Sequence, residues 1–176
     1  MLCSPNNPTG HIYTPREFET ILDMCKRHDI FLVVDEVYRE FIYTGMPYIS
    51  AFHLEGIDDN VVLFDSVSKR YSECGIRIGC LCTKNKTIHD AVMKFCQARL
   101  SPPLIGQIVA EASIDVQKEY LTGVYEEYCE RRNFLIDGLN RIEGVYSPIP
   151  MGAFYTVAKL PVDDAEKFCI WCLSEF

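Results

Sequence analysis

Several features are scarce in this sequence of 176 residues, and each scarcity argues against a class of protein. No long run of basic residues is present and the formal net charge is −8, which argues against a nucleic-acid partner. No apolar segment approaches the roughly 20 residues that a membrane-spanning helix needs, so we expect no membrane partner. The start, MLCSPNNPTG, lacks the charged beginning and apolar core of a secretory signal, and we expect a cytoplasmic protein.

The sequence also lacks the spacing of metal ligands, since its four histidines are dispersed along the chain. Nine cysteines are present, and Cys169 and Cys172 form a CxxC pair of the kind found in zinc and redox sites. That pair lies in an apolar helical pattern, however. Cys80 and Cys82 lie in the apolar run IGCLC, where both should point to one face of a strand. We interpret the cysteines as buried, reduced thiols and predict no metal site.

Short apolar runs alternate with helical patterns in the first half of the chain. Runs at 30–34, 61–64 and 78–82 have the continuous apolar composition of strands, and the first of them reads as buried on both faces. Leu2 and Cys3 look like the end of a further strand. This alternation predicts an α/β fold with a mostly parallel sheet and covering helices.

Helical patterns dominate the rest of the chain. The first helix has the clearest start, because Thr14 is a capping residue, Pro15 fits the first helical position and Glu17 completes a capping box. We expect further helices at 85–99, 104–117 and 118–143 and from 163 onward, and short strands at 145–150 and 153–160. The sequence starts within a strand pattern and ends within a helix pattern, so we expect a fragment of a longer protein.

Polar residues follow the ends of three successive predicted strands. Taken singly, each has an ordinary interpretation as a turn former, a helix cap or a solvated charge. In an open α/β sheet, however, ligands bind beyond the carboxyl ends of the strands. If the strands are parallel neighbours, all of these residues face one crevice. They are Asn7, Asp35, Tyr38, Ser66, Ser68, Lys69 and Arg77.

The chemistry of this set matches one ligand. Arg77 and the two serines suit a phosphate, because they offer a forked guanidinium and hydroxyl donors. Asp35, in a largely buried position, needs a cationic partner. Asn7 and Tyr38 offer neutral hydrogen bonds to a phenolic oxygen, and a partly desolvated Lys69 can attack a carbonyl. A ligand with a phosphate, a protonatable ring nitrogen, a phenolate and an aldehyde is pyridoxal phosphate.

Motifs in this sequence resemble a known family. The motifs are 6-NNPTG-10, 35-DEVY-38 and 66-SVSKRYSECGIRIG-79, and 148-PIPMGAFY-155 resembles the start of the family's small-domain strands. In order and approximate spacing they resemble the fold-type-I pyridoxal-phosphate-dependent aminotransferases of class I/II, the aspartate aminotransferase group. The resemblance implies that residues 1–125 are the second part of the αβα large domain. Residues 126–176 would be a connecting helix and the start of the small α+β domain.

The resemblance also implies a role for each residue of the set. Lys69 would form a Schiff base with the cofactor and move the proton between the substrate Cα and the cofactor. Asp35 would keep the pyridine nitrogen protonated, and Asn7 and Tyr38 would hydrogen-bond the ring 3-oxygen. The phosphate ligands would be Ser66 and Arg77, with Ser68 as a weaker candidate.

The implied function is transfer of an amino group between an amino acid, with aspartate as the default, and a 2-oxo acid, by a homodimer. Two alternatives stay open. One is a carbon–sulfur β-lyase with the same motifs, and the other is a non-catalytic aminotransferase-like fragment or regulator domain. The family's carboxylate-binding arginine lies outside this chain, so we expect no turnover by residues 1–176 alone. Three arginines of the long helix, Arg131, Arg132 and Arg141, are interpreted as solvated charges or structural pairs.

Overall fold

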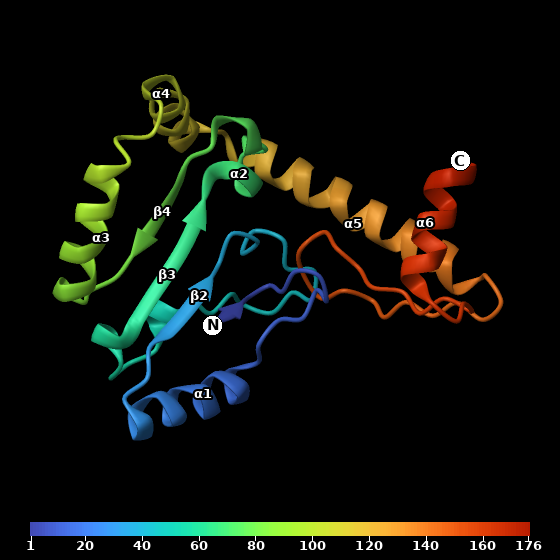
Figure 1. The fold of residues 1–176 in the computed structure, drawn as a ribbon, viewed down its shortest axis with the longest axis horizontal. Helices are drawn as coiled ribbons and strands as arrows, with labels where there is room; N and C mark the ends of the chain where they lie inside the picture. Colours follow the sequence, from blue (N-terminus) through green and yellow to red (C-terminus); the bar gives the residue numbers. More distant parts are fainter.

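A four-stranded sheet forms the centre of the computed structural model, which describes all residues 1–176. The strands lie in the order β1 (Leu2–Cys3), β2 (Leu32–Asp35), β3 (Val61–Ser66) and β4 (Gly79–Cys82). The first three strands are parallel neighbours and β4 runs antiparallel to β3. The predicted mostly parallel α/β sheet is therefore confirmed. The ends of β1, β2 and β3 lie side by side (Figure 1).

The predicted strand at 30–34 is only partly right. Strand β2 begins at Leu32, and its residues alternate between buried and half-buried positions. Ile30 and Phe31 precede the strand and are 45% and 51% exposed, so they are not buried on both faces. The reason is that the turn ending the first helix extends to these residues. Asp29 adopts a left-handed conformation with φ of 48°, and the Ile30 N–H still donates to the Cys25 carbonyl oxygen in that helix.

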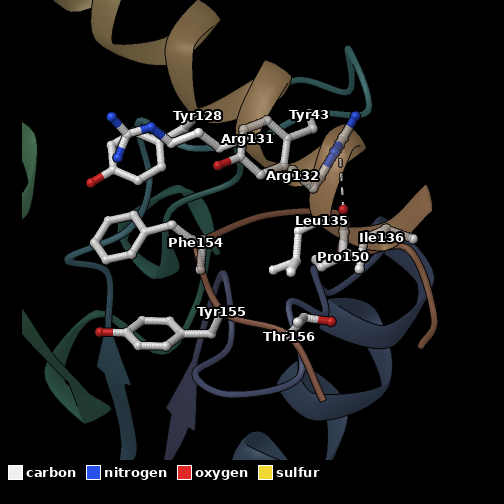
Figure 2. A pocket seen from close by; sticks show the side chains of 11 residues that line it. Tyr43, Tyr128, Arg131, Arg132, Leu135, Ile136, Pro150, Phe154, Tyr155 and Thr156 are labelled. Atoms are coloured by element: carbon white, nitrogen blue, oxygen red, sulfur yellow. Dashed lines mark hydrogen bonds between the residues drawn. The ribbon is translucent and has the colours of Figure 1, made fainter. Parts of the chain in front are cut away.

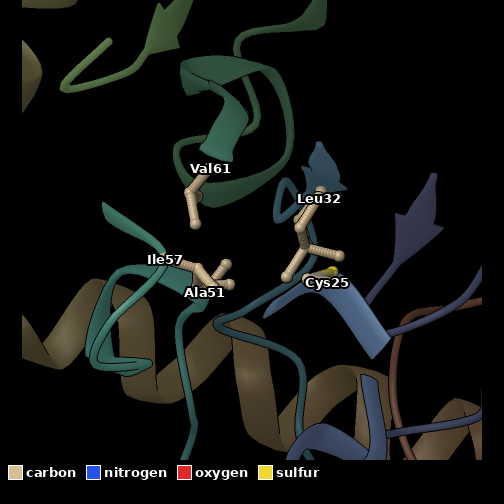
Figure 3. Close-up of a cluster of buried hydrophobic side chains, with 6 residues drawn as sticks. Cys25, Leu32, Ala51, Ile57 and Val61 are labelled. Carbon is tan, nitrogen blue, oxygen red and sulfur yellow. The ribbon is translucent and has the colours of Figure 1, made fainter. Parts of the chain in front are cut away.

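Helix α1 (Pro15–His28) begins as predicted. The Thr14 hydroxyl accepts a hydrogen bond from the Glu17 N–H, and the Glu17 carboxylate accepts one from the Thr14 N–H, which completes the capping box. The buried side of α1 packs against the sheet through Cys25. Figure 3 shows the resulting core, which consists of Cys25, Leu32, Val34, Ala51, Ile57 and Val61.

The remaining helices are α2 (Val67–Arg70), α3 (Lys86–Ala98), α4 (Leu104–Ala112), α5 (Lys118–Asn140) and α6 (Ala165–Glu175). The helices expected at 85–99, at 118–143 and after 163 are present with slightly shorter bounds. The helix expected at 104–117 ends at Ala112, and a 3-10 turn, Ser113–Asp115, follows. Figure 1 shows α5 running from the sheet toward α6.

The two short strands expected at 145–150 and 153–160 do not form, since these segments do not pair with each other in a continuous β-ladder. Only an isolated antiparallel bridge joins Tyr146 to Lys159, and a second one joins Ile42 to Gly152. The backbone of 150–153 bonds instead to two turns from the first part of the chain. The strand prediction is therefore wrong, because these backbone groups find their partners in distant turns.

The cysteine interpretation is half right. The Sγ atoms of Cys80 and Cys82 lie 3.9 Å apart on one face of β4, as predicted. All nine thiols are free, but Cys25 is the only buried one and Cys80 is exposed. The prediction of buried thiols is therefore wrong, because the first half of β4 is exposed and further exposed cysteines lie outside the sheet, at Cys74, Cys96 and Cys169. None of the helices combines the length and hydropathy required to cross a bilayer.

Candidate functional site

Asn7 lies in a tight turn directly after β1. The Ser4 N–H donates to the Asp35 carbonyl oxygen at 3.0 Å, which joins the start of this turn to the end of β2. The Asn7 side-chain N–H then donates to the Tyr38 hydroxyl at 3.5 Å, across 31 positions of sequence. The pairing of β1 with β2 thus brings the first two predicted site segments into contact.

Asp35 is the last residue of β2 and is half-buried. One of its carboxylate oxygens, Oδ1, accepts a hydrogen bond from the Val37 N–H at 3.1 Å. Asp35 forms no ion pair, and Oδ2 has no hydrogen-bond partner within the chain. A half-buried carboxylate without a cation retains acceptor capacity for a positively charged ligand group.

Lys69 lies in the short helix α2, which follows β3 without a break. Its Nζ atom lies 6.0 Å from the ring centroid of Tyr38 and 5.8 Å from that of Phe154. The lysine forms no ion pair and no hydrogen bond, although it is half-buried. The amine is therefore uncommitted, and it faces the residue that also meets Asn7.

Ser66 and Ser68 form a pair at the start of α2. The Ser66 hydroxyl lies 2.8 Å from both the Ser68 hydroxyl and the Ile78 carbonyl oxygen, and it accepts the Ser68 N–H at 3.1 Å. Arg77, directly before Ile78, is exposed and donates to the Cys74 carbonyl oxygen at 2.9 Å. Arg77 is therefore adjacent in sequence to Ile78, whose carbonyl oxygen accepts a hydrogen bond from Ser66. The Arg77 side chain, however, forms no hydrogen bond or ion pair with the other six predicted residues.

Tyr155, which no motif in the sequence singled out as a site residue, belongs to the same cluster. The Tyr38 hydroxyl donates to the Tyr155 hydroxyl at 3.0 Å, across 117 positions of sequence. The Tyr38 ring also meets Phe154 and Tyr155 edge-on, with centroids 5.3 and 5.5 Å apart. Burial of Tyr38 and this hydrogen bond to Tyr155 raise the pKa of Tyr38 well above its usual range, so Tyr38 is neutral at physiological pH.

Two glycines allow the Tyr155 segment to reach the site. The N–H groups of Met151 and Gly152 both donate to the Gly10 carbonyl oxygen, at 3.0 and 2.9 Å, and the Ala153 N–H donates to the Phe41 carbonyl oxygen at 2.9 Å. A Cβ atom on Gly152 would lie 2.7 Å from Pro5 Cβ and 2.8 Å from that same Phe41 oxygen. The motifs NNPTG and MGAFY therefore carry glycines because their backbones touch.

Four charged side chains connect the Tyr38 turn to the Lys69 helix. Asp65 Oδ2 accepts from Arg39 at 2.9 Å and from Arg70 at 2.8 Å, and Arg70 Nε lies 3.0 Å from Glu40 Oε1. Burial alone would lower the pKa of Arg70, but the carboxylates of Asp65 and Glu40 outweigh burial and raise it. Because Arg39 follows Tyr38 and Arg70 follows Lys69, this network fixes the two site residues relative to each other.

A pocket of about 170 Å³ lies beside this cluster, between α5 and the segment 150–156 (Figure 2). None of the seven predicted residues lines it, and Tyr155 connects it to the site. Arg132 lies 4.5 Å from the Tyr43 ring centroid, and Arg131 pairs with Glu127 at 2.7 Å. Arg131 thus forms an exposed ion pair, whereas Arg132 forms no ion pair and lies over an aromatic ring.

The whole chain, residues 1–176, matches the family described as aminotransferase class I and II. The chain belongs to this family. It is 29% identical to the aspartate aminotransferase of Musicola paradisiaca, a match that covers 99% of this chain and 44% of that protein. It is 31% identical to the aspartate aminotransferase of Thermotoga maritima, over 99% of this chain and 45% of the relative.

Solved structures of this aminotransferase family share the fold. The aspartate aminotransferase from Rhizobium meliloti superposes with a TM-score of 0.89 at 28% identity, over 99% of this chain and 47% of that one. The alanine aminotransferase from Pyrococcus furiosus gives a TM-score of 0.89 at 30% identity, over 98% and 46%. The chain thus spans less than half the length of the relatives that it matches.

Membership of the class I and II aminotransferases identifies pyridoxal phosphate as the cofactor. The charges and hydrogen-bonding groups that these side chains leave unused within the chain fit this molecule. The Asp35 carboxylate without a cation is compatible with a protonated ring nitrogen, and the uncommitted Lys69 amine with an aldehyde. The Tyr38 hydroxyl offers a neutral donor for a ring oxygen.

Proposed function

We propose that the protein containing these residues is an aminotransferase that moves an amino group between an amino acid and a 2-oxo acid, with Lys69 as the residue that binds the cofactor covalently. The observation that carries this proposal is the Lys69 amine. It is half-buried, lacks any partner, and faces Tyr38 at the ends of parallel strands. An amine kept free in this position is suited to attack a carbonyl.

Pyridoxal phosphate, when bound, supplies an aldehyde for amines and a ring that withdraws electrons from the substrate Cα. Lys69 would hold the cofactor at its aldehyde carbon, and its free amine would hold and move the proton at the substrate Cα. Asp35 would stabilise the protonated ring nitrogen by charge, since its Oδ2 is otherwise unused. Asn7 and Tyr38 would orient the ring through its 3-oxygen.

Phosphate binding is assigned to Arg77, Ser66 and Ser68. The Ser66 hydroxyl is already engaged with Ile78 and Ser68, so its contribution is to hold the turn as well as the ligand. Arg77 is exposed and bonded to a single carbonyl oxygen, which leaves most of its five N–H donors free for an anion. This division of roles supports Arg77 as the main phosphate ligand.

Aspartate is the proposed amino donor, because three of the relatives and structures described above are aspartate aminotransferases. We further propose that residues 1–125 belong to the large domain and that 126–176 lead into the small domain, with α5 crossing that boundary. The enzyme is proposed to act as a homodimer. Residues 1–176 alone are proposed not to turn over substrate.

The test uses the full-length enzyme loaded with pyridoxal phosphate. The wild-type enzyme should show the visible absorbance of a lysine-bound cofactor, and Lys69→Ala should abolish it. Lys94→Ala, on the exposed side of α3, is the matched control and should leave the band intact. A band that is unchanged in Lys69→Ala would refute the assignment of the lysine.

The reaction type is tested on the same enzyme. Aspartate with 2-oxoglutarate should give glutamate and oxaloacetate. Release of pyruvate and a thiol from cystathionine, without amino transfer, would replace the proposed reaction with that of a β-lyase.

A further inference from the structure

The Tyr38 hydroxyl has a hydrogen-bond arrangement that must change if Tyr38 is to donate to the 3-oxygen of a bound cofactor. A phenolic hydroxyl has one proton to donate. In this structure the Tyr38 proton is given to the Tyr155 hydroxyl at 3.0 Å, and the Asn7 side-chain N–H donates to Tyr38 at 3.5 Å. Tyr38 therefore has no proton left for the 3-oxygen of a cofactor ring.

The Tyr155 hydroxyl can resolve this conflict. It makes no hydrogen bond except the one that it accepts from Tyr38, so its own proton is uncommitted. Rotation about its C–O bond turns it from an acceptor into a donor without moving the ring. The ring itself is held by edge-on contact with Tyr38 and by the backbone bonds of Gly152 and Ala153 to distant turns.

We propose that Tyr155 is a positioning residue for the cofactor and that it acts through Tyr38; this inference rests on the proposed function. With the cofactor bound, Tyr155 donates to the Tyr38 oxygen and Tyr38 donates to the ring 3-oxygen. A hydroxyl that accepts a hydrogen bond becomes a stronger donor, because neighbouring hydrogen bonds polarise one another. Tyr155 thus strengthens the bond by which Tyr38 stabilises negative charge on the ring oxygen.

Few other groups near Tyr38 can produce the same effect. Asn7 faces its hydroxyl from the turn after β1 and does not titrate. The Cys3 thiol, from β1, has a pKa raised by burial and stays neutral. Lys69 faces the Tyr38 ring from α2, and the Asp35 carboxylate lies close enough to Cys3 to raise the pKa of that thiol further. The charge of the ring oxygen is therefore set by Lys69, by Asp35 and by the donor strength of Tyr38.

The experiment is a pH titration of the cofactor absorbance of the full-length holoenzyme. The midpoint of this titration gives the pKa of the proton that is shared between the nitrogen joining Lys69 to the cofactor and the ring 3-oxygen. Loss of the Tyr155 donor leaves more charge on the ring oxygen and makes that proton harder to remove. Tyr155→Phe should therefore raise the midpoint by about 0.1–0.3 pH unit, because one hydrogen bond strengthens a neighbouring one by about 10–30% and the Tyr38 bond itself shifts the midpoint by about one unit at most.

A double-mutant comparison decides whether Tyr155 acts through Tyr38. Tyr38→Phe should raise the midpoint further than Tyr155→Phe does, and the double variant should show no more than the Tyr38→Phe shift. Tyr128→Phe is the matched control, since Tyr128 stacks on Phe154 at 4.8 Å but its hydroxyl forms no hydrogen bond. This control should titrate like the wild-type enzyme.

The outcomes separate this inference from the proposed function. An unshifted midpoint in Tyr155→Phe, or shifts that add fully in the double variant, would overturn the role of Tyr155 and leave the function intact. A wild-type band that survives Lys69→Ala would overturn the function itself. If Tyr155→Phe does not fold, Tyr155→Leu, which also lacks the hydroxyl, replaces it. A raised midpoint in Tyr155→Leu then supports the proposal, and a midpoint equal to that of the wild-type enzyme contradicts it.

Discussion

Substitution of Arg70 by glutamine tests whether the charged network holds the Lys69 helix in place. The Arg70 side chain is 17% exposed, and its partner Asp65 is 12% exposed. Breaking a fully buried ion pair costs about 3–5 kcal/mol. In Arg70→Gln, however, Asp65 keeps its contact with Arg39 at 2.9 Å, and Arg39 is 29% exposed. We therefore expect a loss of about 2 kcal/mol in the free energy of unfolding, between the buried and surface values.

The matched control is Glu40→Gln. Glu40 belongs to the same network but is 42% exposed, so its removal should cost less than about 1 kcal/mol. Both variants are compared with the wild-type full-length enzyme by urea unfolding, with the midpoint and the slope measured separately. The loss in Arg70→Gln should persist in 1 M salt, because ions screen exposed pairs far more than buried ones.

A second measurement connects the network to the site. Because Arg70 directly follows Lys69 in a helix of four residues, its loss should also weaken cofactor binding to the apoenzyme. If the free energy of unfolding of Arg70→Gln lies within about 0.5 kcal/mol of the wild-type value, the usual range of surface substitutions, this account is refuted. It is also refuted if Glu40→Gln lowers the free energy of unfolding as much as Arg70→Gln does.

Two further predictions concern the glycine contact and the capping box. Gly152→Ala should destabilise the protein by about 1–3 kcal/mol and lower its thermal midpoint, because the new Cβ would meet the Phe41 backbone oxygen. The control is Gly123→Ala in α5, where a Cβ meets no other atom, and this variant should not lower the thermal midpoint. Hydrogen bonds from the Thr14 backbone and hydroxyl hold the pKa of Glu17 below its ordinary value of 4.5. The stabilisation by Glu17 relative to Glu17→Gln should thus be complete above pH 4.5 and fade as the pH falls through the lowered pKa, and a constant difference across this range would contradict it.

Local sequence accounts for the elements that depend on neighbouring residues. The capping box at Thr14 and Glu17 is predictable because both partners lie within one helical turn. The helix expected at 104–117 was too long, since a 3-10 turn begins at Ser113, whose hydroxyl donates to Glu73, 40 positions away in the sequence. The strands expected near 145–160 failed because the backbone of 151–153 bonds to Gly10 and Phe41, and only Tyr146 and Lys159 bond to each other.

The sequence by itself determined the alternation of strands and helices, the polar residues that follow the strands and the motifs of the aminotransferase family. These features depend on short-range periodicity and on residues that lie close together in the chain. Tertiary structure alone decided that Tyr155 meets Tyr38 across 117 positions and that Arg39 and Arg70 share Asp65. Such contacts arise from packing between distant segments, and no pattern within either segment encodes the partner.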